Sequence, residues 1–144
     1  MKLKISQCKK SEYPIIADIE KNLFDSPLSV NDLETMNSQK SFKTWKIHGD
    51  YLIGYICYFH VKDEVEIIKL GIMKSHQGKN YGSYLIQKIK SLPIKKIFIE
   101  VSCLNKIAIN FYIKNGFKKI GIRKNYYILK NNSRTDALRL SCEP

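Results

Sequence analysis

One acidic residue stands alone in the basic half of this chain. Between Ile67 and Thr135 the sequence holds thirteen Lys and two Arg, and Glu100 is its single Asp or Glu. Glu100 lies in the apolar run Ile97-Phe98-Ile99-Glu100-Val101, a pattern typical of a buried strand. A carboxylate there loses hydration, which favours a general base whose pKa is raised by burial. The alternative is a structural carboxylate, paired with a lysine or facing water at an edge.

Two further features supply possible chemistry on the C-terminal side of Glu100. Tyr112 follows twelve residues later, on the apolar stripe predicted for a short helix with Ile107, Ala108 and Phe111. Its phenol is a candidate general acid at the same site, or simply a core tyrosine. The pair Tyr126-Tyr127 follows a predicted strand beside bases, and either lines a ligand groove or packs on the sheet near a solvated loop.

Upstream of Glu100 lies the turn Gln77-Gly78-Lys79-Asn80-Tyr81-Gly82-Ser83. It joins a strand ending near Met73 to a helix beginning near Tyr81, and the exposed N–H groups of a helix N-terminus bind anions. Glycine and asparagine tolerate the left-handed conformation that lets a backbone close on a ligand. The alternative is an ordinary strand-to-helix turn. An acid, a phenol and such a turn together indicate an enzyme that acts on a phosphorylated cofactor.

The elements that must position these residues are predicted from periodicity and turn signals. The strands are expected at Lys2–Ser6, Phe42–His48, Tyr51–His60, Glu64–Met73, Ile94–Val101, Phe117–Ile122 and Ala137–Cys142. The helices are expected at Ser11–Phe24 with Ile15, Ile16, Ile19 and Leu23 inward, Ser29–Asn37, Tyr81–Ser91, and between a cap at Asn105 and a C′ residue at Gly116. The order β-α-α-β-β-β-α-β-α-β-β predicts a mixed α/β fold, with one central mixed sheet and helices on both faces.

Composition narrows the class of protein. The 144 residues predict one domain, 1–144, and no run resembles a signal peptide or a membrane span, so we expect a cytoplasmic protein. The formal net charge of +12 reflects either genome composition or a surface that attracts phosphates of a cofactor or RNA. Scattered lysines without interleaved aromatics are a weak nucleic-acid signal, and direct binding to nucleic acid is not expected. No metal is expected, because the three His and four Cys show no ligand spacing.

Taken together, these residues resemble the GNAT superfamily of N-acetyltransferases. The superfamily's acetyl-CoA signature, Gln/Arg-x-x-Gly-x-Gly/Ala after a strand, stands here as Gln77 to Gly82, with Asn80 in place of the first glycine. Within it the chain is similar to the ribosomal-protein alanine N-acetyltransferases, the RimI type. The matching stretches are Ile99-Glu100-Val101, Asn105, Ala108, Phe111-Tyr112, Asn115-Gly116-Phe117, Gly121 to Tyr127, Arg134 to Ala137, and Phe24 to Ser29 with Leu28 where Trp is usual.

The resemblance implies a direct transfer from acetyl-CoA in a ternary complex. Acetyl-CoA would lie between the strands Glu64–Met73 and Ile94–Val101, and no metal would take part. Glu100 would take the amine proton, directly or through water, and Tyr112 would protonate the departing thiolate. The residues implied to bind the cofactor are Leu70, Gly71, Ile72, Gln77, Gly78, Lys79, Asn80, Tyr81, Gly82, Ser83 and Asn105.

The resemblance also implies an acceptor, the N-terminal alanine of a small-subunit ribosomal protein. Asp25, Leu28, Tyr126 and Tyr127 are the candidate residues for its peptide groove, and the enzyme is expected to act as a monomer. Two alternatives stay open: a GNAT enzyme for small amines such as polyamines, and a CoA-binding module without activity. The single acid between Ile67 and Thr135 argues against polyamine substrates. The presence of both Glu100 and Tyr112 argues against a CoA-binding module without activity.

Overall fold

The computed structural model describes residues 2–144. These residues form a single seven-stranded sheet with helices packed on it. Its strands are β1 (Lys4–Gln7), β2 (Phe42–His48), β3 (Leu52–Val61), β4 (Glu64–Ile72), β5 (Lys96–Ser102), β6 (Lys118–Ile128) and β7 (Arg134–Cys142). The helices are α1 (Tyr13–Leu23), α2 (Val30–Asn37), α3 (Tyr81–Lys90) and α4 (Lys106–Lys114), with short 3₁₀ turns η1 (Lys10–Glu12) and η2 (Lys74–His76). Within these residues no helix has the length and apolar character needed to cross a membrane.

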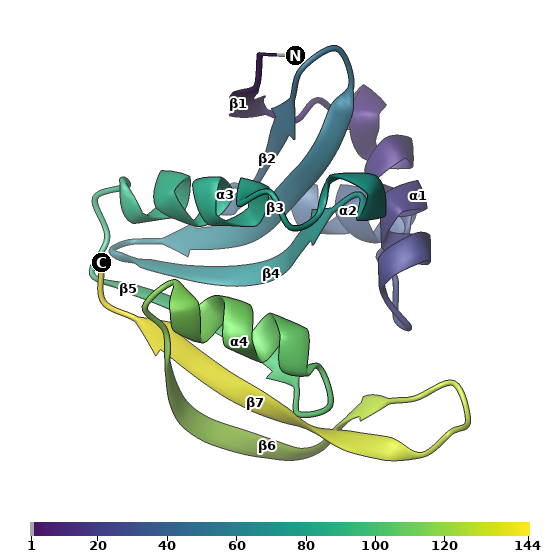
Figure 1. Ribbon diagram of the computed structural model, residues 1–144, viewed down its shortest axis with the longest axis vertical. Coiled ribbons are helices and arrows are strands. Elements are labelled where there is room, and N and C mark those ends of the chain that lie inside the picture. The colour runs from purple at the N-terminus through teal and green to yellow at the C-terminus, as the bar shows by residue number, and fades with distance from the viewer. Residues whose placement is uncertain (1) are drawn as a thin grey trace.

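The sheet order is β1-β2-β3-β4-β5-β7-β6, and the helices cover both faces (Figure 1). α3 and α4 pack on one face against a core that includes Ile56, Ile86 and Ile97. α1 and α2 pack on the other face against a second core around Ile16, Leu33 and Tyr55. This confirms the predicted mixed α/β order with helices on both faces of one sheet.

The ends of helices α2 and α4 lie where capping residues in the sequence predicted them. Ser29 and Asp32 form a reciprocal capping box at the start of α2. Asn105 caps α4, since its Oδ1 accepts a hydrogen bond from the Ala108 N–H at 3.1 Å. Gly116 follows α4 with φ +94°, a conformation that favours glycine.

Three predictions about where residues lie in the elements were wrong. β6 continues to Ile128, so Tyr126 and Tyr127 lie within a strand that pairs with β7 rather than after one. Ile107 is 86% exposed, because the inward positions of α4 are Ile109 and Tyr112 and a residue two before Ile109 lies on the opposite side of a helix. Ile15 of α1, also predicted to point inward, is 45% exposed, while Ile16 and Ile19 are buried.

The feature that positions the site is the divergence of β4 and β5. They pair in parallel over Glu64–Ile67 and Lys96–Ile99, and no further. Beyond that point β4 stays paired with β3 through Ile72, while β5 stays paired with β7 through Ser102. The β5-facing edge of β4 therefore carries backbone groups with no strand partner, and a gap opens in the middle of the sheet.

Candidate active site

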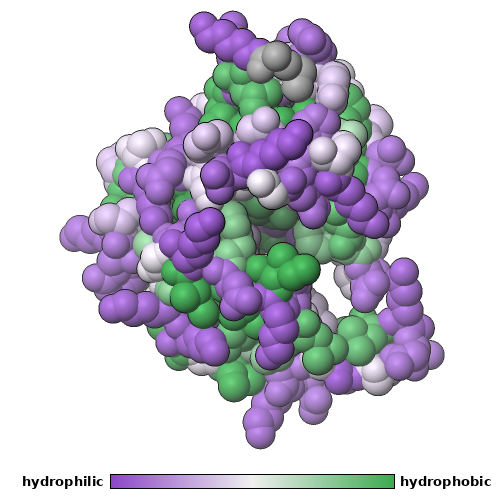
Figure 2. Space-filling view, in the orientation of Figure 1, coloured by the Kyte–Doolittle hydropathy of each residue, from purple (hydrophilic) through white to green (hydrophobic). Residues whose placement is uncertain are grey.

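Two cavities meet at the gap between β4 and β5. The turn-side cavity, of about 510 Å³, lies between the turn at residues 77–83 and α4. The hairpin-side cavity, of about 440 Å³, lies between residues 23–26, β5 and the end of β6. Both are lined by Leu70, Asn105, Ala108 and Tyr112, so the two spaces are continuous at these residues. Figure 2 shows this face hollowed near its middle, with hydrophobic residues at the hollow and hydrophilic ones around it.

The turn before α3 has the left-handed backbone that its glycine and asparagine predict. Asn80 adopts the left-handed conformation, with φ +66° and ψ +14°, and Gly78 has φ +78°. No side chain caps the helix, so the first N–H groups of α3 face the turn-side cavity without an intramolecular side-chain acceptor. A Cβ at Gly82 would lie 3.0 Å from the Phe111 ring, so glycine lets α3 approach α4 closely here.

Two predicted turn residues lie differently from the rest. The Gln77 side chain donates a hydrogen bond from Nε2 to the Ile72 carbonyl at 2.9 Å, which ties the turn to the end of β4. Lys79 is exposed and does not line the cavity. The lining cations are instead Lys74, from η2, and Lys114, from the last turn of α4, with His76 beside them. These three were not predicted: Lys114 comes from a helix that lies beyond α3 and β5 in the chain, whereas Lys74 and His76 directly precede the turn and carried no motif of their own.

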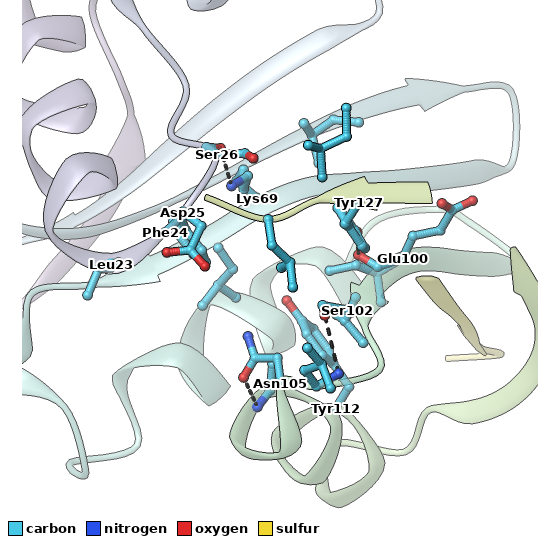
Figure 3. Close-up of a pocket in the computed structure, with 18 residues that line it drawn as sticks. Leu23, Phe24, Asp25, Ser26, Lys69, Glu100, Ser102, Asn105, Tyr112 and Tyr127 are labelled. Atoms are coloured by element: carbon cyan, nitrogen blue, oxygen red, sulfur yellow. Dashed lines mark hydrogen bonds between the residues drawn. The ribbon is translucent and has the colours of Figure 1, made fainter. Parts of the chain in front are cut away.

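The predicted β4 segment and the α4 cap border the turn-side cavity. Leu70, Gly71 and Ile72 line it at the edge where β4 lacks a partner, so a backbone N–H there is available to a bound carbonyl oxygen. Asn105 uses Oδ1 for its cap, and in Figure 3 its amide nitrogen points away from the helix toward the cavity.

Tyr112 lies where the two cavities join. Its ring is 4% exposed and packs edge-on against Phe111 and Phe117, with centroids 5.0 and 5.2 Å away. Burial, and then the neighbouring Tyr127, raise the pKa of Tyr112 above its ordinary value near 10. Among residues 2–144 the hydroxyl has no hydrogen-bond partner, so it is a protonated phenol available to a bound molecule.

Glu100 lies on the hairpin-side cavity and is an ion-paired carboxylate. Arg123 Nη2 lies 2.9 Å from Oε1, and Arg139 Nη1 donates to the same oxygen at 3.2 Å. Arg139 also bridges to Glu66 at 3.1 Å. The partners are arginines of β6 and β7 rather than the lysine considered from sequence. In Figure 3 the carboxylate points away from Tyr112, and the Glu100 side chain is 13% exposed.

Of the four residues predicted for a peptide groove, the structure brings two to the cavity. Asp25 and Tyr127 line the hairpin-side cavity, and the Tyr127 hydroxyl donates to the Glu100 carbonyl at 3.1 Å. Leu28 packs into the core beneath α1 and α2 instead, and Tyr126 stacks under the Arg123 guanidinium outside the lining. The wall also includes Ser26, which lies in the predicted Asp25–Leu28 loop, and residues that were not predicted for it, among them Phe24, Lys69, Ser102, Leu104, Ile128 and Leu129.

The described residues contain no group of three His, Cys, Asp or Glu placed to hold a metal ion. The four cysteines are free thiols, with Cys57 and Cys142 buried and Cys8 and Cys103 partly exposed. None of the four lines either cavity.

The fold and this site define an acetyltransferase. The model of the Acetyltransferase (GNAT) family matches residues 9–117, which is most of the chain and includes the turn, Glu100 and Tyr112. The chain belongs to the GNAT family of acetyltransferases.

Individual relatives resemble the chain over nearly its full length. The [ribosomal protein bS18]-alanine N-acetyltransferase of Haemophilus influenzae is 26% identical over 142 residues, covering 96% of this chain and 97% of the relative. The crystal structure of the ribosomal-protein-S18-alanine N-acetyltransferase from Escherichia coli superposes with a TM-score of 0.88 at 21% identity, covering 99% of this chain and 94% of that one. A spermidine N-acetyltransferase SpeG chimera from Vibrio cholerae and hSSAT superposes with a TM-score of 0.84 at 20% identity, covering 99% and 96%.

The residues of the turn-side cavity fit acetyl-CoA, the donor that a GNAT site implies. The uncapped N-terminus of α3 and the cations Lys74 and Lys114 suit its phosphates. The unpartnered edge of β4 suits its amide-rich arm, which needs backbone partners.

Proposed function

We propose that this protein transfers an acetyl group from acetyl-CoA to the N-terminal α-amine of a protein, the N-terminal alanine of the small-subunit ribosomal protein bS18. The observation that carries the proposal is the junction of two cavities at Tyr112, one suited to a phosphorylated donor and one bordered by loops that can admit a chain end. The relative from Haemophilus influenzae, alike over nearly its whole length, supports the choice of acceptor.

The donor is held by the chain's backbone in this proposal. The amides of residues 78–83 bind the pyrophosphate, the edge of β4 at residues 70–72 binds the pantetheine arm and the thioester oxygen, and Asn105 contacts the arm through its amide nitrogen. Tyr81 helps to line this space, and Gln77 acts through its hold on Ile72. When bound, acetyl-CoA supplies an electrophilic thioester carbonyl and a thiolate leaving group.

Glu100 and Tyr112 move the protons. An α-ammonium has a pKa near 8, so at neutral pH it must lose a proton before its nitrogen can attack. Both arginines contact Oε1 of Glu100, and we assign Oε2 as the oxygen that takes this proton. The carboxylate points away from Tyr112, so the proton travels through water. The Tyr112 hydroxyl gives its proton to the departing sulfur.

The acceptor cavity is poorly suited to a polyamine. Asp25 is paired with Lys130 at 3.5 Å, and Glu100 is paired with two arginines, so the lining carboxylates are already matched by cations. Lys69 adds a further positive group to the wall. A polycation entering this space would meet net positive charge, whereas a chain end carries a single charge on its α-amine. We place the reaction in the cytoplasm, with a monomeric enzyme.

A comparison of acceptors tests the proposal. Release of CoA should be measured with a peptide that copies the N-terminus of bS18 from its alanine, with the same peptide starting with a bulky residue, and with spermidine. We expect the highest kcat/KM for the alanine peptide. Faster release with spermidine would contradict the assignment of the acceptor and support a small-amine enzyme.

A further inference from the structure

A buried carboxylate outside both cavities ties their walls together. Glu20 of α1 is 0% exposed and lines neither cavity. Burying a charge is costly unless it is paired and hydrogen-bonded. Glu20 meets both conditions, because its carboxylate accepts hydrogen bonds from the Leu28 N–H at 2.9 Å and the Tyr55 hydroxyl, and Lys69 Nζ lies 3.3 Å away.

On the hairpin side, this cluster holds the segment between α1 and α2, residues 24–29. That segment has no regular structure, so its position depends on individual contacts. Leu28 is tied to Glu20, and Lys69 donates to the Ser26 carbonyl at 3.2 Å (Figure 3). The Lys69 ammonium also lies 3.8 Å from the centroid of the Phe24 ring. Phe24, Asp25 and Ser26 form one wall of the cavity proposed for the acceptor.

On the donor side, the cluster reaches β4 through Tyr55. Tyr55 is fully buried on β3 and pairs with Gly71 of β4. A Cβ at Gly71 would lie 2.4 Å from the Tyr55 hydroxyl oxygen, so the phenol occupies the space beside that glycine. Burial, and then the Glu20 charge, raise the pKa of Tyr55, which keeps the hydroxyl protonated and donating to Glu20.

We propose that Glu20 is a positioning residue for transfer: through Lys69 and the Leu28 amide it fixes residues 24–28 as the acceptor wall, and through Tyr55 it fixes Gly71 beside the donor. The inference rests on the proposed function for what the wall binds. Glu20 touches neither substrate and acts through its three partners. A purely structural role would predict only a loss of stability on mutation.

The test compares two variants of the Glu20–Lys69 ion pair with a variant of a matched ion pair elsewhere in the protein. E20Q removes the charge and keeps the shape, and K69M removes the cation. The control is K46M, because Lys46 and Glu12 form a similarly sheltered ion pair that joins β2 to η1 away from both cavities. For each protein we would measure the melting temperature, the acetyl-CoA Kd by calorimetry, and KM for the alanine-starting bS18 peptide.

We expect E20Q and K69M each to raise the peptide KM by about tenfold, the scale of one lost charge-assisted hydrogen bond. The acetyl-CoA Kd should rise by no more than about twofold, because the α3 turn is untouched and the Tyr55 side chain still fills the space beside Gly71. The double variant should be no worse than either single variant, since the two side chains act through each other. K46M should lower the melting temperature without changing KM. An unchanged KM in E20Q, or an equal rise in K46M, would overturn the proposal.

Hydrogen exchange separates this proposal from the choice of acceptor. If no peptide is acetylated by the unmodified protein, the proposed function fails, but the Leu28 amide still reports the position of the segment. We expect this amide to exchange faster in E20Q and K69M than in the unmodified protein, and to be unchanged in K46M. Equal Leu28 exchange in all four proteins would overturn the positioning role whatever the acceptor is. If E20Q fails to fold, K69M and Y55F provide the same comparison.

Discussion

At the scale of single residues, the proposed chemistry depends on two proton transfers. One involves Tyr112 and the other Glu100, and the two side chains lie in different environments. Tyr112 is buried, its hydroxyl has no hydrogen-bond partner among the described residues, and burial raises its pKa, so the phenol is protonated at neutral pH. Its hydroxyl can therefore donate a hydrogen bond to the sulfur as negative charge develops there, and pass its proton as the thiolate departs. Glu100 is held by two arginines through one oxygen, which fixes its orientation and leaves the other oxygen outside these ion pairs.

Y112F should keep the fold and slow transfer. Removal of the hydroxyl breaks no internal hydrogen bond, so the melting temperature should stay close to that of the unmodified protein. Loss of a general acid should lower kcat by about 10²–10⁴-fold. The control is Y58F, because Tyr58 is equally buried but accepts a hydrogen bond from Trp45 away from the cavities, and its loss should lower stability without lowering kcat. If Y112F unfolds or keeps full turnover, Tyr112 is a core tyrosine only.

E100Q should lower turnover far more than acetyl-CoA affinity. The amide keeps the shape of the side chain but cannot take a proton from the acceptor amine. The matched control is E66Q, which removes the other carboxylate partner of Arg139 and should leave kcat nearly unchanged. Steady-state rates across pH and calorimetric binding of acetyl-CoA make the comparison. Unchanged E100Q turnover at every pH, or an equal loss in E66Q, would leave Glu100 with a structural role alone.

At the scale of elements, the turn before α3 shows which parts of the site could be predicted from the sequence alone. The geometry of Gly78 and Asn80 was predictable because a left-handed turn before a helix depends on nearby residues only. The places of Leu28 and Tyr126 were not. Leu28 turns toward the core beneath α1 and α2, and the continuation of β6 to Ile128 places Tyr126 under Arg123 of the same strand. Packing between distant elements does explain why Lys114 of α4 was missed while the turn opposite it was found.

N80V tests the turn directly. A β-branched residue in the left-handed region costs about 1–2 kcal/mol, so the turn should open and the amides of α3 should lose their alignment. Since 1.4 kcal/mol corresponds to about tenfold in affinity, the acetyl-CoA Kd should rise by about that factor. N80G should bind at least as tightly as the unmodified protein, because glycine adopts this conformation freely. Equal Kd values for N80V and the unmodified protein would show that the turn does not hold the donor.

At the scale of the whole molecule, the site exists because the sheet parts between β4 and β5. The two strands pair over four residues and then follow different partners, so a space crosses the sheet between helices on one side and loops on the other. The resemblance to the GNAT superfamily was sufficient to predict that the site lies between these two strands. Their point of divergence was not predictable, because it depends on the twist of all seven strands together.

Alkaline pH should destabilise the fold through its buried phenols. Burial raises the pKa of Tyr127 to about 12, and also raises the pKa of Tyr55 and Tyr112. Because these pKa values are raised in the folded state, the stability that the neutral phenols contribute is complete below about pH 10 and is lost as pH rises further.

Urea unfolding at about pH 9 and pH 11 measures this effect. We expect the free energy of unfolding to fall over this interval, and to fall less in Y127F. The exposed Tyr84 provides the control, so Y84F should follow the unmodified protein. Identical pH dependence in Y127F and the unmodified protein would contradict the burial argument for Tyr127.

In the proposed reaction an α-amine meets the donor at the junction of the two cavities. The most direct measurement is release of CoA from acetyl-CoA with the alanine-starting bS18 peptide, run beside the same peptide with its N-terminus blocked. We predict release with the free peptide only, together with a product acetylated at its α-amine. Equal release from both peptides, or none from either while acetyl-CoA still binds, would contradict the claim.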